Sequence, residues 1–510
     1  AAEGAFHRDL HQVVGILPVE GDGARKAAHP GQEGGKFVGE HGVGVVHMNK
    51  TSAGWILFHP PNVFVSYRPP SFMIATMNAS HFLLRRLACA LLLCGAGAAQ
   101  AQLRLPALNL PHPLGQGTLD TLVRPAERLL ERGVAGDLRA LRRDAVQSLL
   151  QRHRGVLEAD PRGEPIVRRE ILANSPSAGA LRAAAGLGFE VVREERFEEL
   201  GESLVVLRVP STLGTAEALA ALRALDPGGS YDFNHLYTGS GAADAKAAPA
   251  GETGGGAPAS SAVGLVDSGV DQAHPVFADA RIDSFGCEGK PHPAPHGTAV
   301  AALMVGRAER FSGAAPGARL YAADIYCDSP TGGSADKIAG ALGWMARSKV
   351  GVVNISLVGP PNATLERVVA AMLARGHLLV AAVGNDGPAA PPLYPASYPG
   401  VVGVTGVDRE GRPLPEAGRG PQVMFAAPGS QMVSAAPGQP PYRQVRGTSF
   451  AAPIVAALLA KTLPQPDRAG AARALAGLAA QAVREGGMVS NATGHGVVGA
   501  ALRVDPARFR

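Results

Sequence analysis

From residue 261 onward, short apolar runs alternate with alanine-rich stretches, and this alternation restricts the fold more than any other feature of the chain. The apolar runs cover residues 262–266, 318–325, 351–357, 378–383, 400–407 and 422–427. The helical stretches cover residues 297–306, 334–347, 363–375, 450–462 and 469–483. Strands that are apolar along their whole length are buried on both faces, as in a parallel sheet covered by helices. The predicted class is therefore α/β, with a mostly parallel sheet and helices on both faces.

The composition is that of a folded chain with an ordinary surface. Of its 510 residues, 46% are hydrophobic and 18% are charged, which supplies a sizeable core and excludes a fully disordered chain. The formal net charge is +5, and the basic residues are spread along the chain rather than clustered among aromatic residues. Such diffuse charge is typical of a solvated surface, so no nucleic-acid partner is expected.

Residues 77–101 have the layout of a secretory signal, with a basic start, an apolar run from Leu87 to Ala99 and a small residue, Ala101, at the expected cleavage site. The apolar run is too short to cross a bilayer, which needs roughly 20 residues. We therefore expect export to the periplasm or the medium, without a stable membrane anchor. Because a signal peptide acts only at an N-terminus, residues 1–76 are expected to be a non-native leader, or alternatively a disordered extension.

The remaining chain divides by composition into four parts. Their expected bounds are 102–177, 178–237, 238–260 and 261–510. The first part is rich in arginine, with a helical spacing of apolar residues. The second contains two strands, 189–192 and 203–209, and a helix that Thr215 is expected to cap, which together predict a small α+β module. The third has the composition of a flexible linker, and the fourth is the α/β domain.

Three polar residues of the α/β domain end or open buried elements. Asp267 ends an apolar strand, while His296 and Ser449 each open an apolar helix. Each alone would more often be a turn, surface or capping residue. Together they supply a nucleophile, a neutral imidazole that can take its proton, and a carboxylate that orients the imidazole. Pro453 is expected in the first turn of its helix, where a missing N–H breaks no bond.

These residues lie in motifs that resemble those of the subtilisin-like serine peptidases, peptidase family S8. The matching motifs, within about residues 261–500, are Asp267-Ser-Gly, His296-Gly-Thr, Ala382-Val-Gly-Asn385 and Gly447-Thr-Ser449-Phe-Ala-Ala-Pro. The chain order Asp, His, Ser is that of this family, whereas α/β-hydrolase esterases have the order Ser, Asp, His. The resemblance implies a serine endopeptidase that forms an acyl-enzyme, with Asn385 donating its side-chain amide to the oxyanion.

The resemblance also implies which residues contact a polypeptide substrate. One edge of the groove is expected to add the substrate as a further strand, opposite a glycine-rich edge. Val358 stands where relatives usually have glycine, and Leu393 is expected at the floor of the pocket before the cleaved bond, so an apolar side chain of modest size is expected there. The implied contact residues are Ser356, Leu357, Val358, Gly332, Gly333, Gly384 and Leu393.

The module at 178–237 stands where this family has its propeptide, which implies a zymogen that binds its own N-terminal module and cleaves itself within 238–260. A stably retained accessory domain is the alternative. Cys287 and Cys327 are a candidate disulfide in an exported protein. No cofactor or metal is expected, because the chain has no Cys-x-x-Cys pair and the stretch after Val305 lacks the asparagine-rich segment that binds calcium in some relatives.

Two other functions use the same residues differently. An esterase can use the same triad, since both reactions are acyl transfers. A catalytically inactive binding protein would keep the fold and lose one of the four residues Asp267, His296, Ser449 and Asn385, all of which are present.

Overall fold

The computed structural model describes residues 138–239, 242–248, 261–484 and 487–509, together with four short strands between residues 36 and 57. The chain forms two units, 1–107 and 108–510. In the first unit these strands form two antiparallel hairpins. The strands are β1 (Lys36–Gly39), β2 (Gly42–Val45), β3 (Met48–Thr51) and β4 (Gly54–Leu57). The predicted signal peptide at 77–101 lies outside the described residues.

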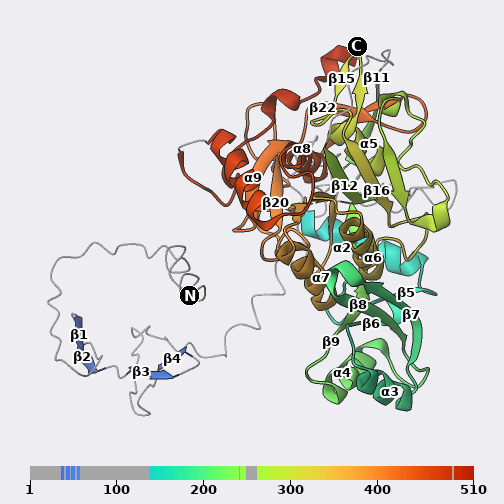
Figure 1. Cartoon of the computed structure of the whole chain (residues 1–510), viewed down its shortest axis with the longest axis vertical. Helices are drawn as coiled ribbons and strands as arrows, with labels where there is room; N and C mark the ends of the chain where they lie inside the picture. The colour runs from blue at the N-terminus through green and yellow to red at the C-terminus, as the bar shows by residue number, and fades with distance from the viewer. Residues whose placement is uncertain are drawn as a thin grey trace, which may run out of the picture. The chain divides into compact units, whose positions relative to one another are not determined.

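The centre of the second unit is a seven-stranded sheet in which every pairing is parallel (Figure 1). The strand order is β13-β16-β12-β17-β19-β20-β21. The strands are β12 (Ala262–Asp267), β13 (Ile282–Phe285), β16 (Arg319–Asp324), β17 (Val352–Ile355), β19 (Leu378–Ala382), β20 (Val402–Val407) and β21 (Val423–Pro428). All six predicted apolar runs form strands here, which confirms the α/β class. The sequence did not predict β13, an edge strand whose side chains are only partly buried.

Helices cover both faces of this sheet. The helices are α5 (Pro295–Val305), α6 (Ala335–Arg347), α7 (Ala363–Ala374), α8 (Thr448–Ala460) and α9 (Arg468–Gln481). Alternate side chains of β12 enter two separate cores: Val263 and Leu265 pack with α5 and α8, and Val266 packs with α6 and α7. Because α8 is buried along nearly its whole length, its sequence is apolar on all sides.

Shorter strands surround the main sheet. They are β10 (Thr238–Gly239), β11 (Ala242–Ala248), β14 (Arg307–Ala308), β15 (Phe311–Ser312), β18 (Leu357–Val358), β22 (Met432–Ala435) and β23 (Tyr442–Arg446). The pairing of β11 with β23 corrects the expectation that 238–260 is a flexible linker throughout. This pairing uses backbone groups along an edge strand, so the alanine-rich sequence of β11 carries no apolar alternation that would predict it.

Residues 157–239, here called the N-terminal module, form a second, antiparallel sheet with strand order β5-β6-β8-β7 and β9 beside β6. Its elements and the preceding helix are α2 (Leu138–Arg152), β5 (Leu157–Ala159), β6 (Pro165–Asn174), α3 (Ala178–Gly186), β7 (Glu190–Phe197), β8 (Glu202–Arg208), α4 (Thr215–Leu225) and β9 (Ser230–His235). The boundary expected at residue 178 is wrong, because β6 pairs with both β8 and β9. The polar run Arg168-Arg169-Glu170 interrupts the strand pattern of β6 in the sequence.

Helix α4 has the predicted bounds, but Thr215 does not cap it. Gly214 is the N-cap residue, and its N–H donates to the carboxylate of Glu217 in the first turn. The hydroxyl of Thr215 instead donates to Glu158, which ties α4 to β5.

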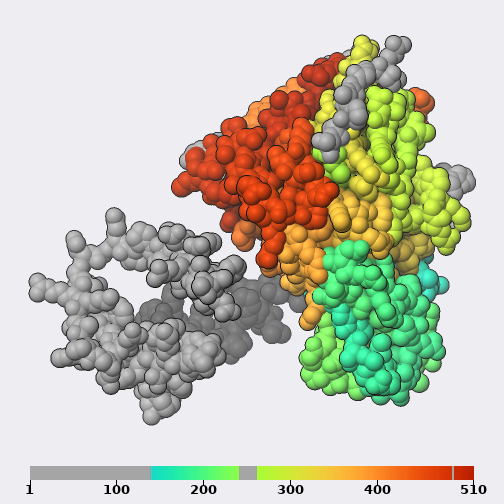
Figure 2. All heavy atoms as spheres, viewed as in Figure 1, coloured from blue at the N-terminus to red at the C-terminus, as the bar shows by residue number. Residues whose placement is uncertain are grey.

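The N-terminal module packs against α6 and α7 (Figure 1), and its atoms, in green in Figure 2, lie directly against those of the α/β domain. Leu172, Phe197 and Leu204 of the module share one buried cluster with Ile338 of α6 and Val368 of α7. The opposite face of the module sheet is covered by α3 and α4. Within the described residues, no helix combines the length and apolar composition needed to cross a membrane.

Candidate active site

The side chains predicted to form a triad come from three elements that end or begin at one edge of the parallel sheet. Asp267 is the last residue of β12, and His296 and Ser449 are the second residues of α5 and α8. The residues are 0%, 6% and 0% exposed, respectively. The Nδ1 atom of His296 lies 2.8 and 3.0 Å from the two carboxylate oxygens of Asp267. This contact fixes the imidazole, and its Nε2 atom is buried without a hydrogen-bond partner among the described residues.

Ser268, which the sequence reasoning missed, joins the carboxylate to the helix that carries His296. The N–H of Ser268 donates to Asp267 Oδ1 at 2.6 Å, and its hydroxyl donates to the same oxygen at 3.1 Å. The N–H of Gly297 donates to the Ser268 hydroxyl at 3.0 Å. The only signal in the sequence was the place of Ser268 in the Asp267-Ser-Gly motif.

Ser449 is held by a reciprocal contact with Ser356. The Ser449 hydroxyl donates to the Ser356 carbonyl oxygen at 3.1 Å, and the Ser356 hydroxyl donates to the Ser449 carbonyl oxygen at 2.9 Å. Asn354 donates to the Ser356 hydroxyl at 2.8 Å. The aromatic ring of Phe450, the next residue, lies 5.4 Å from the imidazole of His296, which brings the start of α8 beside the start of α5.

The position of Pro453 explains the contact that Ser356 makes. Pro453 is the sixth residue of α8 and not in its first turn, which corrects the expectation from the sequence. In a regular helix the N–H of residue 453 would donate to the carbonyl of Ser449, and proline has no N–H. The hydroxyl of Ser356 supplies the missing donor. This side chain therefore contacts Ser449, and the contact of Ser356 with substrate stays a prediction.

Asn385 follows β19 at the same edge of the sheet. Its side-chain oxygen accepts a hydrogen bond of 3.1 Å from the N–H of Thr448, which directs its amide nitrogen to the opposite side. The preceding residue, Gly384, has a φ of +95°, which glycine adopts without strain. A Cβ atom on Gly384 would lie 2.5 Å from Leu393 Cδ1 and 3.5 Å from Val358 Cγ1. Three of the predicted pocket residues therefore meet at this turn.

The predicted groove holds a segment of the chain itself. In β10, Thr238 pairs antiparallel with Val358, and Gly239 pairs with Leu357. On the other side, Leu236 pairs with Ser334, and the N–H of Tyr237 donates to the Gly333 carbonyl oxygen at 2.8 Å. Residues 236–239 therefore lie between the two edges that the sequence predicted. Gly332 lies in the turn before the second edge, where its N–H donates to the carbonyl of Ser329.

Backbone pairing begins again at β11, next to the segment that leads into Ser449. Ala242, at the start of β11, pairs with Arg446, which lies three residues before Ser449. The chain is therefore held by backbone pairing on both sides of the buried serine, as an added strand.

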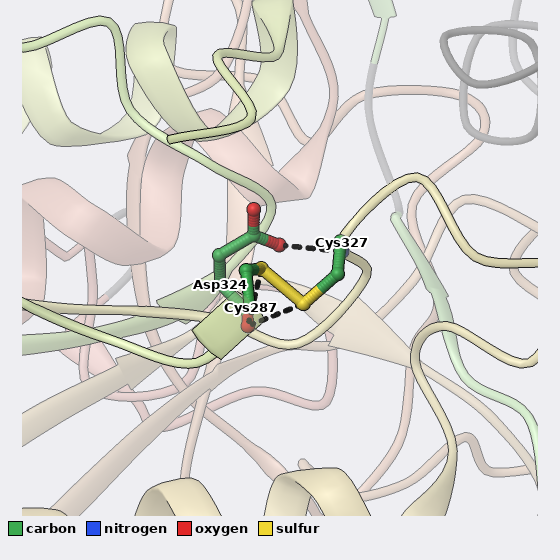
Figure 3. A group of neighbouring side chains, drawn as sticks. All are labelled: Cys287, Asp324 and Cys327. Atoms are coloured by element: carbon green, nitrogen blue, oxygen red, sulfur yellow. Dashed lines mark hydrogen bonds between the residues drawn. A yellow bond between two sulfur atoms is a disulfide. The ribbon is translucent and has the colours of Figure 1, made fainter. Parts of the chain in front are cut away.

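A disulfide joins Cys287 and Cys327 beside the end of β16, with an S–S distance of 2.13 Å (Figure 3). Both sulfur atoms lie 3.7 Å from the carbonyl oxygen of Asp324, and the carboxylate of Asp324 accepts the N–H of Cys327. These three residues form the one group among the described residues whose atoms lie close enough to hold a metal ion. Cysteine binds a metal ion as a thiolate, and the two sulfurs here are bonded to each other, so only the carboxylate remains and the group does not fit a metal centre.

Asp324 is a second acidic residue close to the triad, because it pairs directly with Asp267 across β16 and β12. Burial raises the pKa of the Asp324 carboxyl, and the nearby charge of Asp267 acts in the same direction. The N–H groups of Tyr326 and Cys327 oppose this shift by donating to the carboxylate. The loop closed by the disulfide therefore holds the Asp324 carboxyl group next to Asp267, in surroundings that disfavour its ionised form.

Comparison with known proteins finds similarity to subtilisins. Residues 259–496 match the model of the subtilase family, peptidase S8. Subtilisin of Bacillus pumilus is 32% identical over 210 residues, which are 39% of this chain and 76% of that protein. Subtilisin E of Bacillus subtilis is 32% identical over 210 residues, 39% of this chain and 55% of that protein, so the chain spans about half the length of several relatives that it matches.

The fold has a solved counterpart. The crystal structure of fervidolysin from Fervidobacterium pennivorans, described as a keratinolytic enzyme related to subtilisin, matches with a TM-score of 0.56. The match covers 68% of this chain and 62% of fervidolysin at 20% identity. At this identity the likeness shows the subtilisin-like fold.

Proposed function

Because this chain belongs to the subtilase family, we propose that it is a serine endopeptidase that hydrolyses peptide bonds through an acyl-enzyme. Ser449 is the nucleophile, His296 the general base and Asp267 the residue that orients the imidazole. The burial of all three residues and the contact between Asp267 and His296 Nδ1 support these roles. Asn385 and the N–H of Ser449 are the oxyanion donors, and the N-terminus of α8 favours the developing negative charge.

The reaction follows from these positions. Ser449 Oγ attacks the peptide carbonyl carbon while His296 Nε2 takes the hydroxyl proton, and Asp267 stabilises the imidazolium that forms. The carbonyl oxygen becomes an oxyanion, which the amide of Asn385 stabilises more strongly than the starting carbonyl. The imidazolium then protonates the leaving amine, and a water molecule deprotonated by His296 releases the acyl group from Ser449.

The observation that carries the proposal is the pairing of the chain across its own site. The pairing of Thr238 with Val358 and of Gly239 with Leu357 leads the chain toward Ser356, whose carbonyl accepts the Ser449 hydroxyl. Pairing begins again at Ala242 on the other side of Ser449. We therefore expect the enzyme to cleave itself between Gly239 and Ala242, the last and first residues of the two paired segments.

According to this proposal, the N-terminal module is a propeptide that remains bound after cleavage. Its apolar cluster with α6 and α7 and the seating of residues 236–239 in the groove support this role. Val358 and Leu393 converge on Gly384 and narrow the pocket that was predicted to hold the side chain before the cleaved bond, so a small side chain is preferred there. Export is part of the proposal, and the disulfide is suited to an oxidising compartment.

The test is the fate of the full chain carrying Ser449→Ala. The wild-type protein is expected to be cut into two fragments, the second beginning at residue 240, 241 or 242, while the variant stays intact because it has no nucleophile. Intact mass and N-terminal sequencing measure this result. Ser348→Ala, at the end of α6 away from the site, is the matched control and is expected to be cleaved like the wild type. Cleavage of the Ser449→Ala chain would overturn the proposal.

The alternatives are separated by two further measurements. A serine-reactive fluorophosphonate labels Ser449 in an active enzyme and leaves an inactive binding protein unlabelled. Comparing peptide and short ester substrates separates a peptidase from an esterase. The extended peptide strand in the groove favours the peptidase.

A further inference from the structure

An ion pair between Glu416 and Arg446 joins the loop before β21 to the strand that leads into Ser449. Glu416, in the loop between β20 and β21, is 4% exposed, and Arg446 is the last residue of β23. The Nε atom of Arg446 lies 2.7 Å from Glu416 Oε1, and its Nη2 atom donates to Glu416 Oε2 at 2.9 Å. The guanidinium therefore contacts both oxygens of the carboxylate, which fixes the orientation of the two side chains as well as their distance.

The loop that carries Glu416 also holds the turn that contains Asn385. The N–H of Gly387 donates to the Glu416 carbonyl oxygen at 2.8 Å, and the N–H of Gly418 donates to the Gly384 carbonyl oxygen at 3.0 Å. The loop and the turn are close together, because a Cβ atom on Gly418 would lie 2.8 Å from the carbonyl oxygen of the residue before Gly384. The loop therefore holds the turn on both sides of Asn385.

The other partner of the ion pair belongs to the segment of the nucleophile. Arg446 lies three residues before Ser449, and Thr448 contacts the turn of Asn385 directly. The N–H of Thr448 donates to the Asn385 side-chain oxygen at 3.1 Å, and the N–H of Gly384 donates to the Thr448 hydroxyl at 3.2 Å. Together with the ion pair, these bonds close a ring of contacts that includes the Asn385 side chain and the start of α8.

A second ion pair holds the same turn from the N-terminal part of the chain. The Nε atom of Arg142 lies 3.4 Å from the carboxylate of Asp386, the residue after Asn385. Arg142 belongs to α2, which precedes the N-terminal module, so this contact is lost when the cleaved fragment leaves. The pair of Glu416 and Arg446 lies within the α/β domain and remains after the fragment has left.

We propose that Glu416 and Arg446 are positioning residues that hold the amide of Asn385 at the site of the oxyanion. The inference rests on the proposed function, which assigns Asn385 and Ser449 their roles. An oxyanion donor is effective only at hydrogen-bond distance from the developing charge, and a misplacement of about 1 Å costs about 10²-fold in rate. Loss of the ion pair is therefore expected to lower kcat and to leave KM nearly unchanged, because the donor acts mainly in the transition state.

The test is the double variant Glu416→Gln with Arg446→Gln in the full-length chain after self-processing. Removal of one charge leaves its partner buried and unpaired, whereas removal of both leaves no such charge. The denaturation midpoint is therefore expected to fall in each single variant and to recover in the double variant. The kcat of the double variant on a peptide substrate is expected to stay at least tenfold below that of the wild type, counted per Ser449 labelled by the fluorophosphonate. A kcat within twofold of the wild type, or a loss in KM instead, would overturn the inference.

The variant Asn385→Ala shows whether the ion pair acts through Asn385. In this background the oxyanion donor is absent, so adding Glu416→Gln and Arg446→Gln is expected to lower kcat by less than twofold further. A further tenfold loss would overturn the inference, because the ion pair would then act independently of Asn385.

The pair of Asp283 and Arg319 supplies a matched control. Arg319 also donates to both oxygens of its partner, but it lies at the start of β16, whereas Asp267 is level with the end of that strand. Asp283→Asn with Arg319→Gln is expected to leave kcat unchanged, and a loss equal to that of the test variant would overturn the inference. Failure of the proposed function is distinct, since the wild-type protein would then cleave no peptide and Ser449 would stay unlabelled.

Discussion

Single residues around Ser449 supply hydrogen bonds that the local backbone cannot make. Pro453 removes the donor for the Ser449 carbonyl, and Ser356 replaces it with a side-chain hydroxyl that is itself held by Asn354. The same arrangement brings the Ser356 carbonyl within 3.1 Å of the Ser449 hydroxyl. A proline inside a buried helix therefore ties the start of α8 to the segment that follows β17.

Ser356→Ala tests this exchange at the scale of one residue. The change leaves the Ser449 carbonyl and the Asn354 amide without this partner, which is expected to cost about 1–3 kcal/mol in the free energy of unfolding. Pro453→Ala restores a backbone N–H, so the double variant is expected to recover part of this loss. Chemical denaturation of the two single variants and the double variant measures the coupling. Additive losses without recovery would contradict the explanation.

The sequence correctly predicted the helices and strands in which one face, or both faces, are uniformly buried. The six apolar runs became strands and α4 has its predicted bounds, because burial on both faces or on one helical face leaves a periodic pattern. The strands β6 and β11 were missed since β6 carries the polar run at 168–170 and the alanine-rich sequence of β11 has no alternation of apolar and polar residues. In the candidate site, Asp267 and His296 were predictable from local motifs. The contacts of Ser268, Ser356 and Tyr237 join segments far apart in the chain and leave no local signal.

Two glycines of α6, Gly340 and Gly343, face the N-terminal module and offer a matched comparison. A Cβ atom on Gly343 would collide with the ring of Phe197, which is buried and cannot move aside, while one on Gly340 would meet only the end of the Glu195 side chain. Alanine is the better helix former at both positions by about 1 kcal/mol.

Gly343→Ala is therefore expected to weaken binding of the module at least tenfold, and Gly340→Ala to weaken it far less. The fraction of module that elutes with the α/β domain after self-cleavage, measured by size-exclusion chromatography over a dilution series, reports the affinity. Equal retention of the module in the two variants would contradict the role of close packing at Gly343.

At the scale of the whole molecule, a series of hydrogen bonds between buried polar side chains joins the N-terminal module to the α/β domain. It lies next to residues 236–239, the segment in the groove. His235 is 0% exposed. Its Nε2 atom lies 3.4 Å from the carboxylate of Asp160, and its Nδ1 atom accepts a hydrogen bond of 2.9 Å from the side-chain amide of Asn362. Asn362 also accepts the N–H of Leu365 as the N-cap of α7. Although burial opposes its charge, hydrogen bonds from His235, Glu164 and Arg162 hold the pKa of Asp160 well below its usual range.

A lowered pKa means that the stability contributed by Asp160 is complete above its ordinary pKa of about 3.9 and is lost as the pH falls toward the lowered value. Acid below about pH 4 is therefore expected to loosen His235 and release the cleaved module, so peptidase activity measured after return to neutral pH rises. Asp160→Asn removes the charge at every pH and is expected to release the module at neutral pH and to flatten the acid dependence. Asp144→Asn, which changes an exposed carboxylate of α2, is the control. Retention of the module in Asp160→Asn equal to that in Asp144→Asn would show that the Asp160 charge does not hold the module in place.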